Sequence, residues 1–457
     1  MAGIGFELRK ILKEDRLLSL AKVYGYSAIL SSGPWVISIV AILLVGFINL
    51  ANYGEQSDVY RFQVVITYAI ALASSLILTG ILQLPFTRYI ADLIFNHRED
   101  EILPSYFGAL FLSWIIGGPI VAPFYAWVFE GQSTVFILGA LATFLALCGV
   151  WISSILAASL KYYKGVVWAY FISYSLIILI SIFYGDTIEK LIYTFFIGNT
   201  ILFVILMTLI IKSYNSTIFM KLDFFLEKNF YWTLGIAGLA YNLGAWVDKF
   251  IFWYDPATGH AVIGKLNASI VYDMPIFLAY LSILPGMAIF FYRLESDFAE
   301  KYDLFYDAVR SGGTLGRIRE YKDQMVEVVR HALHEILMIQ GIINIIIFLT
   351  APTVFTMLNI PQLYLGLFYV LTMGAMLQVA FMSILAILYY LDRKKVAMWL
   401  SIAFFVLNTI LTLISIDMGP SMYGYGYTVS LLLVFTAAVI VIKNEMERLE
   451  YETFMLQ

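Results

Sequence analysis

The chain has 457 residues, of which 61% are hydrophobic and 13% charged, and its mean hydropathy is +0.85. Soluble domains carry roughly a quarter charged residues, so this composition excludes a soluble protein of this length and predicts a polytopic membrane protein. The net charge of −4 is too small to indicate a class of partner, and a single cysteine, Cys148, excludes an internal disulfide.

The first 22 residues alternate apolar residues with Arg9, Lys10, Lys13, Arg16 and Lys22. This pattern is typical of an amphipathic helix on a membrane surface, here the cytoplasmic face. Two interpretations stay open, a membrane anchor and a docking surface for a cytosolic partner. The apolar segment that follows is too long for a signal-peptide core and has no small-residue cleavage pattern, so we expect the N-terminus to be retained.

Twelve apolar segments follow, each long enough to cross roughly 30 Å of hydrocarbon. They lie near Val23–Leu50, Phe62–Phe86, Ser105–Phe129, Ser133–Leu160, Gly165–Tyr184, Leu191–Ile211, Tyr231–Tyr254, Ile270–Tyr292, Ala332–Met357, Leu363–Leu391, Val396–Ile416 and Tyr423–Ile442. With the N-terminus inside, all but four of the 28 Lys and Arg residues are cytoplasmic, as the positive-inside rule requires. The four are Arg61, Lys190, Lys249 and Lys265. An even number of spans also returns the C-terminus to the cytoplasm.

Two short matches indicate an internal repeat. The Gly-Pro-Trp-Val of residues 33–36 matches the Gly-Ala-Trp-Val of residues 244–247, and Leu84-Pro85 matches Leu284-Pro285. After the segment 1–22 we therefore expect two lobes of six spans, 23–229 and 230–457, which would be parallel repeats because six is even. The predicted fold class is an all-α integral membrane protein of twelve transmembrane helices in two six-helix parallel-repeat lobes with a central cleft.

The longest segment between two spans, residues 293–331, is highly charged and has helical periodicity on both sides of Ser311-Gly312-Gly313-Thr314. We expect a cytoplasmic helical segment there. It is interpreted either as a solvated hairpin that caps the membrane domain or as a surface that binds a partner.

Polar residues within the spans predict the lining of a transport cavity. In the first span Pro34 predicts a kink, because its ring removes a backbone hydrogen bond and clashes with the preceding turn. Other polar residues in spans often serve only to hold helices together. The predicted cavity residues are Ser31, Pro34, Trp35, Asn242, Trp246, Asp248, Lys249 and Asp273.

The charged residues of the seventh and eighth spans stand out within this set. A charge at the centre of a membrane helix costs roughly 2.5–3.5 kcal/mol, so such residues usually face a protein interior or a watery cavity. Neighbours on a helix point about 100° apart, so we expect Asp248 and Lys249 not to satisfy one another. The hypothesis is an ion pair between Lys249 and Asp273, with Asp248 left as a proton or cation site. A purely structural charge network is the alternative.

Enzyme chemistry has little support in the sequence. His331-Ala332-Leu333-His334-Glu335 is not the His-Glu-x-x-His zinc signature, and the Ser311–Gly316 stretch lacks the Gly-Lys-Ser/Thr of a phosphate-binding loop. We therefore expect no catalytic residue, no metal site and no cofactor. Energy would then come from an ion gradient, from the membrane potential, or from a partner that pushes the substrate.

Three stretches resemble the PelG family: Met1–Lys10, Ser31–Trp35 and Tyr241–Lys249. This family exports the Pel exopolysaccharide and is related to the multidrug/oligosaccharidyl-lipid/polysaccharide (MOP) flippases. The resemblance implies a two-lobed, V-shaped transporter in the bacterial cytoplasmic (inner) membrane. It also implies membrane partners of the PelD and PelE type, a cytosolic PelF-type glycosyltransferase, and a polymer rich in N-acetylated aminosugars.

The predicted function is therefore secondary-type export of a Pel-like aminosugar exopolysaccharide during its synthesis, with no nucleic acid involved. Within the same superfamily, a cation-coupled multidrug or lipid-linked oligosaccharide flippase is the alternative. A membrane acyl- or glycosyltransferase would need a catalytic motif around one of the four His residues. A non-transporting membrane scaffold is the remaining option.

Overall fold

The computed structural model describes residues 36–54, 58–70, 73–159, 163–226, 231–357 and 360–455, which are nearly all helical. The predicted Ser31, Pro34 and Trp35 and the amphipathic segment 1–22 lie outside these residues. The chain divides into two compact units. In described residues, the N-terminal unit holds 36–246 and 252–269, and the C-terminal unit holds 247–251 and 270–455.

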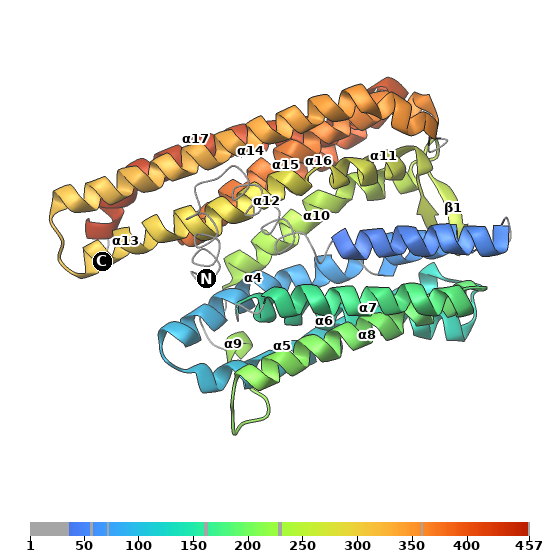
Figure 1. Cartoon of the computed structure of the whole chain (residues 1–457), viewed down its shortest axis with the longest axis horizontal. Helices are drawn as coiled ribbons and strands as arrows, with labels where there is room; N and C mark the ends of the chain where they lie inside the picture. The colour runs from blue at the N-terminus through green and yellow to red at the C-terminus, as the bar shows by residue number, and fades with distance from the viewer. Residues whose placement is uncertain are drawn as a thin grey trace, which may run out of the picture. The chain divides into compact units, whose positions relative to one another are not determined.

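The N-terminal unit is a bundle of long helices joined by short connections (Figure 1). It begins with a helix over Val36–Tyr53. Its other elements are α3 (Val59–Val64), η2 (Val65–Ile70), α4 (Ala73–Phe95), η3 (Glu99–Glu101), α5 (Ile102–Val128), α6 (Thr134–Ser159), α7 (Tyr163–Tyr184), α8 (Ile188–Ser213), α9 (Asp223–Leu226), and most of α10 (Trp232–Tyr254), followed by the strands β1 (His260–Ile263) and β2 (Leu266–Ala268).

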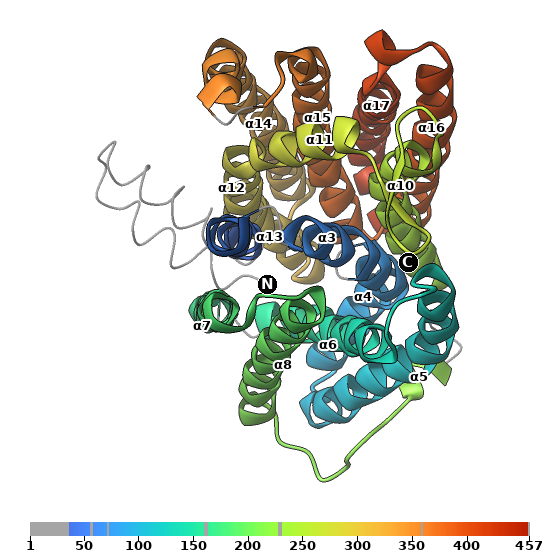
Figure 2. The same ribbon diagram turned by 90° about the vertical axis from the view of Figure 1, so that its right-hand side faces the viewer.

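Helix α6 is the centre of this bundle. It packs against α4, α5 and α8, and Figure 2 shows it between α5 and α8. Its side chains Phe136, Ala140 and Phe144 are fully buried, so one face of the helix meets protein along several turns. Such burial of an apolar helix on several neighbours is typical of the interior of a helix bundle.

The β1–β2 hairpin is fastened to the end of α5. Gly264 in its turn has a φ of +56°, which a residue without a Cβ adopts at little cost. The next residue, Lys265, donates its backbone N–H to the carbonyl of Val128 and lies with Nζ 2.6 Å from Glu130 Oε2 and 4.9 Å from the centre of the Trp127 ring. The Lys265 ammonium also holds the pKa of Glu130 below its usual value.

The C-terminal unit contains the remaining helices (Figure 1). They are α11 (Ile270–Leu281), α12 (Leu284–Tyr292), η4 (Arg293–Phe298), α13 (Ala299–Arg310), α14 (Leu315–Met357), η5 (Gln362–Tyr364), α15 (Leu365–Tyr390), α16 (Lys394–Asp417), η6 (Pro420–Met422) and α17 (Tyr425–Met455). Helix α15 packs against α11, α14, α16 and α17, and fourteen of its residues are buried, as expected of a central membrane helix.

The predicted eighth span is broken between α11 and α12, with a bend of 42°. A broken helix leaves backbone groups without partners, which is tolerated at membrane depth only where protein satisfies them. Gln340 of α14 does so on both sides of the break: its Nε2 donates to the Ser282 carbonyl at 2.7 Å, and its Oε1 accepts from the Gly286 N–H at 3.2 Å. The amide thus replaces the missing hydrogen bonds of the helix.

The predicted helical segment over residues 293–331 is present as η4, α13 and the first part of α14. The C-terminal part of α17 joins it, because Glu450 pairs with Lys322 at 2.6 Å and with Arg319 at 3.2 Å. Figure 1 shows the turn between α13 and α14 and the end of α17 at the same end of this unit. We call α13, α14 up to Glu335, and α17 from Lys443 onward the polar extension.

Ten helices among the described residues are long and apolar enough to cross a membrane, and eleven if the bent pair of α11 and α12 counts as one span. The expected twelve are thus not confirmed. Helix α10, which coincides with the predicted seventh span, is not among the candidates. It carries Asn242, Asp248 and Lys249 among its apolar residues, and these strongly polar side chains lower its hydropathy. The predicted lobe boundary near residue 230 and the central cleft stay predictions.

Candidate functional site

The structure buries the charged pair of α10 completely. Asp248 is 0% and Lys249 1% exposed. The Lys249 Nζ lies 3.2 Å from each carboxylate oxygen of Asp248. The expectation that these neighbours cannot pair is wrong, because the four-carbon stem of lysine is long and flexible enough to return the ammonium to the adjacent side chain. The pair lies in the C-terminal unit.

Asp248 receives hydrogen bonds from two further helices. The Tyr272 hydroxyl of α11 donates to Oδ2 at 2.6 Å, and the Asn408 amide of α16 donates to Oδ1 at 3.4 Å. Asn408 is held in turn by the Thr412 hydroxyl, which donates to its Oδ1 at 3.0 Å. A buried carboxylate is stable only when its lone pairs are satisfied, and here both oxygens accept from neutral donors as well as from Lys249.

Lys249 is held by tyrosines. Its Nζ donates to the Tyr280 hydroxyl at 3.1 Å and lies 5.1 Å from the centre of the Tyr280 ring and 5.6 Å from that of Tyr427. Aromatic faces attract cations most strongly where water is absent. The Tyr427 hydroxyl donates to Gln378 Oε1 at 2.6 Å, which extends the network to α15. We call Asp248, Lys249, Tyr272, Tyr280, Asn408 and Tyr427 the charge cluster.

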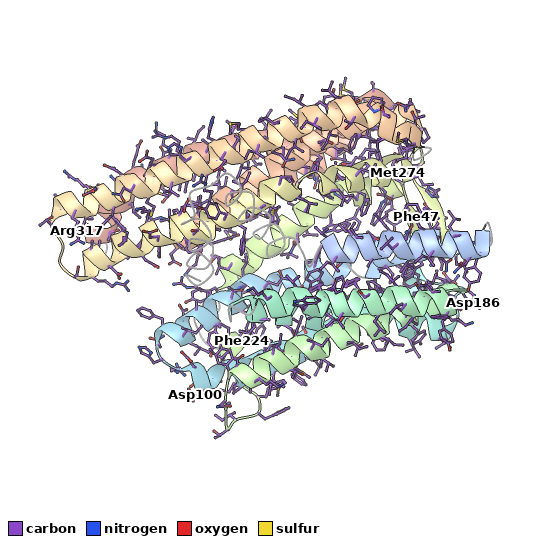
Figure 3. The ribbon with its side chains drawn as sticks, viewed as in Figure 1. Phe47, Asp100, Asp186, Phe224, Met274 and Arg317 are labelled. Atoms are coloured by element: carbon purple, nitrogen blue, oxygen red, sulfur yellow. The ribbon has the colours of Figure 1, made fainter. Side chains whose placement is uncertain are left out.

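Asp273 lies in the first turn of α11, next to Tyr272, and is 8% exposed. The ion pair that the structure shows for Lys249 is with Asp248. The predicted pair of Lys249 with Asp273 stays a prediction. Figure 3 labels the adjacent Met274, which is 39% exposed, so the helix turns from buried to exposed within one residue.

Asn242 and Trp246 lie earlier on α10, in the N-terminal unit. The Asn242 amide donates to the Leu76 carbonyl of α4 at 3.1 Å. The two helices cross closely, because a Cβ on Gly238 would collide with the Gly80 carbonyl. Small residues that let backbones approach are typical of membrane helix contacts. Asn242 thus holds α10 against α4, while Trp246 is half-buried.

Sequence reasoning missed the three tyrosines of the charge cluster. Tyr272 precedes Asp273, and Tyr280 follows Tyr272 by eight residues, about two helical turns, so both lie on one face of the span. That spacing was an available signal. A tyrosine in an apolar segment is more commonly an interfacial anchor, however, and the helix pairing that brings Tyr427 to Lys249 has no sequence signature.

The arrangement is suited to holding one negative and one positive side chain away from water. A carboxylate, an ammonium, and three phenols lie within hydrogen-bond or ring contact in a closed interior. Among the described residues no group of three or more His, Cys, Asp or Glu side chains could hold a metal ion.

A family model described as "PelG: Putative exopolysaccharide Exporter (EPS-E)" matches residues 1–454. The chain belongs to the PelG family. The resemblance noted in the sequence is thereby confirmed, and this PelG-family chain is a multi-pass membrane protein of a transporter family. A search of curated proteins found no match.

Solved transporters of the MOP superfamily share the fold. An outward-facing multidrug resistance MATE transporter has a TM-score of 0.66 at 14% identity and covers 93% of this chain and 96% of its own. A MOP superfamily transporter from Pyrococcus furiosus, whose binding pocket is described as reversed in polarity, has a TM-score of 0.68 at 13% identity, covering 94% and 96%. A MATE protein in a bent conformation has a TM-score of 0.65 at 14% identity, and the match covers 95% of this chain and 97% of that protein. At these identities the likeness concerns the fold alone.

Proposed function

We propose that this chain exports an aminosugar exopolysaccharide of the Pel type from the cytoplasm across the bacterial inner membrane during synthesis. The observation that carries the proposal is the PelG family match over residues 1–454. The fold shared with MOP transporters supports a carrier and gives no support to an enzyme. Both termini would lie in the cytoplasm, as the distribution of Lys and Arg residues favours.

The polymer would be handed over by partners. Proteins of the PelD and PelE type would form a complex with the exporter in the membrane, and a PelF-type glycosyltransferase would deliver the growing chain. The polar extension and the basic residues 1–22 supply the charged surfaces for these contacts. Because a synthase that adds sugars can also push the chain outward, no ion gradient is needed in this scheme.

The charge cluster would act where the transport path forms. Asp248 and Lys249 neutralise one another in the closed interior. Transporters of this kind move by alternating access, in which packed helices separate on one side at a time. Separation at α10 would expose a carboxylate and an ammonium to the passing sugars, whose hydroxyl and amide groups can hydrogen-bond to both. Asp273, Trp246, Asn242, Ser31, Pro34 and Trp35 are proposed to line the same path.

Vesicles that contain the synthesis machinery test this proposal. We expect polymer to reach the far side only when this chain is present, and to continue doing so after the proton gradient is collapsed, provided that polymerisation continues. Complete loss of export with intact polymerisation would contradict the pushing mechanism.

The second candidate is a cation-coupled flippase of drugs or lipid-linked oligosaccharides. The observation that favours it is the Asp248 carboxylate, because an ionisable residue that is fully buried within a membrane helix commonly serves transport. Expression of this chain alone distinguishes the two: altered drug efflux in cells without the synthesis partners favours the flippase, and unchanged efflux favours the polymer exporter.

A further inference from the structure

A groove lies between α14 and α17 of the C-terminal unit, with a cavity volume of about 380 Å³. The apolar part of its lining consists of Val326, Val329, Leu333, Val439, Ile442 and Met446. The charged part consists of Lys322, Asp323, Arg330, Lys443 and Glu447. A groove lined by both kinds of side chain fits a ligand that has both a charged and an apolar part.

The groove lies at the level where the apolar helices become charged. Helix α14 carries no charged residue from Ile336 to Met357, and α17 carries none from Tyr425 to Ile442. Lys443 follows directly on the second stretch, and Arg330 precedes the first by six residues, about 9 Å along a helix. The headgroup layer of a bilayer begins at this boundary and is several ångströms deep.

Two of the cations are poorly neutralised by protein. Lys322 is paired with Glu450 at 2.6 Å. Arg330 is exposed and, within the part of the chain that the structure describes, has neither an ion pair nor a hydrogen bond from its side chain. Lys443 is 74% exposed, and its ion-pair partner Glu447 is 3.9 Å away. Asp323 lies about two turns farther from the apolar stretch than Arg330, so it does not cancel the charge at the membrane boundary.

We propose that this groove binds an anionic phospholipid. Arg330 and Lys443, one from each helix, would hold the headgroup phosphate, and Leu333, Val439 and Ile442 would contact the first methylene groups of an acyl chain. Basic pockets between membrane helices at the headgroup level are suited to this, because each cation near an anionic surface strengthens the attraction. The lipid would bridge α14 and α17 at the base of the polar extension. This site is separate from the charge cluster and does not depend on the proposed export function.

The test uses the full-length chain in detergent, mixed with phosphatidylglycerol or phosphatidylcholine, and native mass spectrometry to count retained lipid. We expect preferential retention of phosphatidylglycerol and a roughly tenfold or greater loss in the double variant Arg330→Gln/Lys443→Gln. The matched control is Arg317→Gln/Arg448→Gln. It removes two exposed charges from the same two helices outside the groove, and Figure 3 shows Arg317 at the far end of the extension. The control should retain lipid like the unmodified chain.

Equal losses in both double variants, or a loss in neither, would overturn the proposal. Glycerol phosphate without acyl chains distinguishes a soluble phosphate from a lipid: if it displaces the lipid at similar concentration, the ligand is a free phosphate and the proposal fails. Leu333→Asn should also weaken lipid retention, because it removes an apolar contact with the acyl chain. The charge-preserving Arg330→Lys/Lys443→Arg should retain lipid, and if it does not, the loss in the Gln variant reflects altered packing and the proposal is wrong.

Discussion

At the scale of single residues, the central feature is an ion pair between sequence neighbours in a closed interior. Taking two charges out of water is costly, and the attraction between them offsets this cost only with good geometry and further hydrogen bonds. Asp248 and Lys249 have both, through Tyr272, Asn408 and Tyr280. The pair is therefore stable as a unit, and each charge is costly once the other is removed.

Single and double replacement should reveal that coupling. We expect Asp248→Asn and Lys249→Met each to lower the free energy of unfolding by about 3–5 kcal/mol, because each leaves an uncompensated buried charge. The double variant should lose much less stability than the sum of the losses in the two single variants. Unfolding in detergent measures all three, and additivity within about 0.5 kcal/mol would show that the two charges are independent.

Removal of a hydroxyl group from the charge cluster should lower the free energy of unfolding more than removal of a buried hydroxyl group elsewhere. Tyr272→Phe removes a donor to a carboxylate, worth about 1.5–3 kcal/mol, whereas Tyr106→Phe removes a neutral bond to Ser153, worth about 0.5–1.5 kcal/mol. Both tyrosines are fully buried, so their thermal unfolding in detergent can be compared directly. If the two variants lose equal stability, the hydroxyl of Tyr272 does not support the charge of Asp248.

The sequence was sufficient to single out Asp248 and Lys249, because charges are rare within apolar segments and must have a reason there. It was not sufficient to predict their partners. The expected depth in the membrane suggested Asp273 as the partner of Lys249, whereas the structure shows that the flexible lysine side chain also reaches the adjacent Asp248. Partners such as Tyr427 come from a helix nearly 180 residues later, and only the tertiary packing of α10 with α17 brings them together.

At the scale of elements, the membrane helices depart from regular geometry where side chains compensate for it. The break between α11 and α12 depends on one amide, that of Gln340. The sequence predicted one continuous span there, because the segment is long and largely apolar around the break and Pro285 is compatible with the first turn of a new helix as well as with a kink. The compensating glutamine is on α14, more than 50 residues away.

Gln340→Leu should therefore destabilise the C-terminal unit. It leaves the Ser282 carbonyl and the Gly286 N–H without this partner, and each unsatisfied buried group costs about 1–3 kcal/mol. Ser383→Ala is the control, because the Ser383 hydroxyl bonds only within its own helix. The temperature of unfolding in detergent should fall strongly for Gln340→Leu and little for the control. A similar small decrease in both variants would exclude the proposed role of the amide.

The crossing of α4 and α10 should be equally sensitive to a single methyl group. A Cβ on Gly238 would meet backbone atoms of Gly80, which cannot move aside cheaply, so we expect Gly238→Ala to cost about 1–3 kcal/mol. Gly341→Ala is matched as a control, because no atom lies within 4 Å of its Cβ position. Yield of folded protein and thermal unfolding should separate the two, and a stable Gly238→Ala variant would show that this contact is looser than described.

At the scale of the whole molecule, sequence reasoning succeeded on the class of protein and on the family. Composition excluded a soluble fold, and the Met1–Lys10 and Tyr241–Lys249 stretches identified the PelG family, which the family model confirms. It predicted twelve spans where the described residues contain ten or eleven candidates, because α10, the predicted seventh span, carries polar residues that lower its hydropathy. The proposed transport path, its substrate and its partners rest on the family.

On the proposed function, the interior around Asp248 and Lys249 opens to water while polymer is exported. Cys148 is buried and would be replaced first, followed by Trp246→Cys on α10 and, as a lipid-facing control, Ile345→Cys on the exposed apolar face of α14. Membrane-impermeant thiol reagents would then be applied from each side with synthesis running or stopped. We expect labelling at position 246 that depends on synthesis and none at position 345. Position 246 remaining unlabelled from both sides during active export would contradict it.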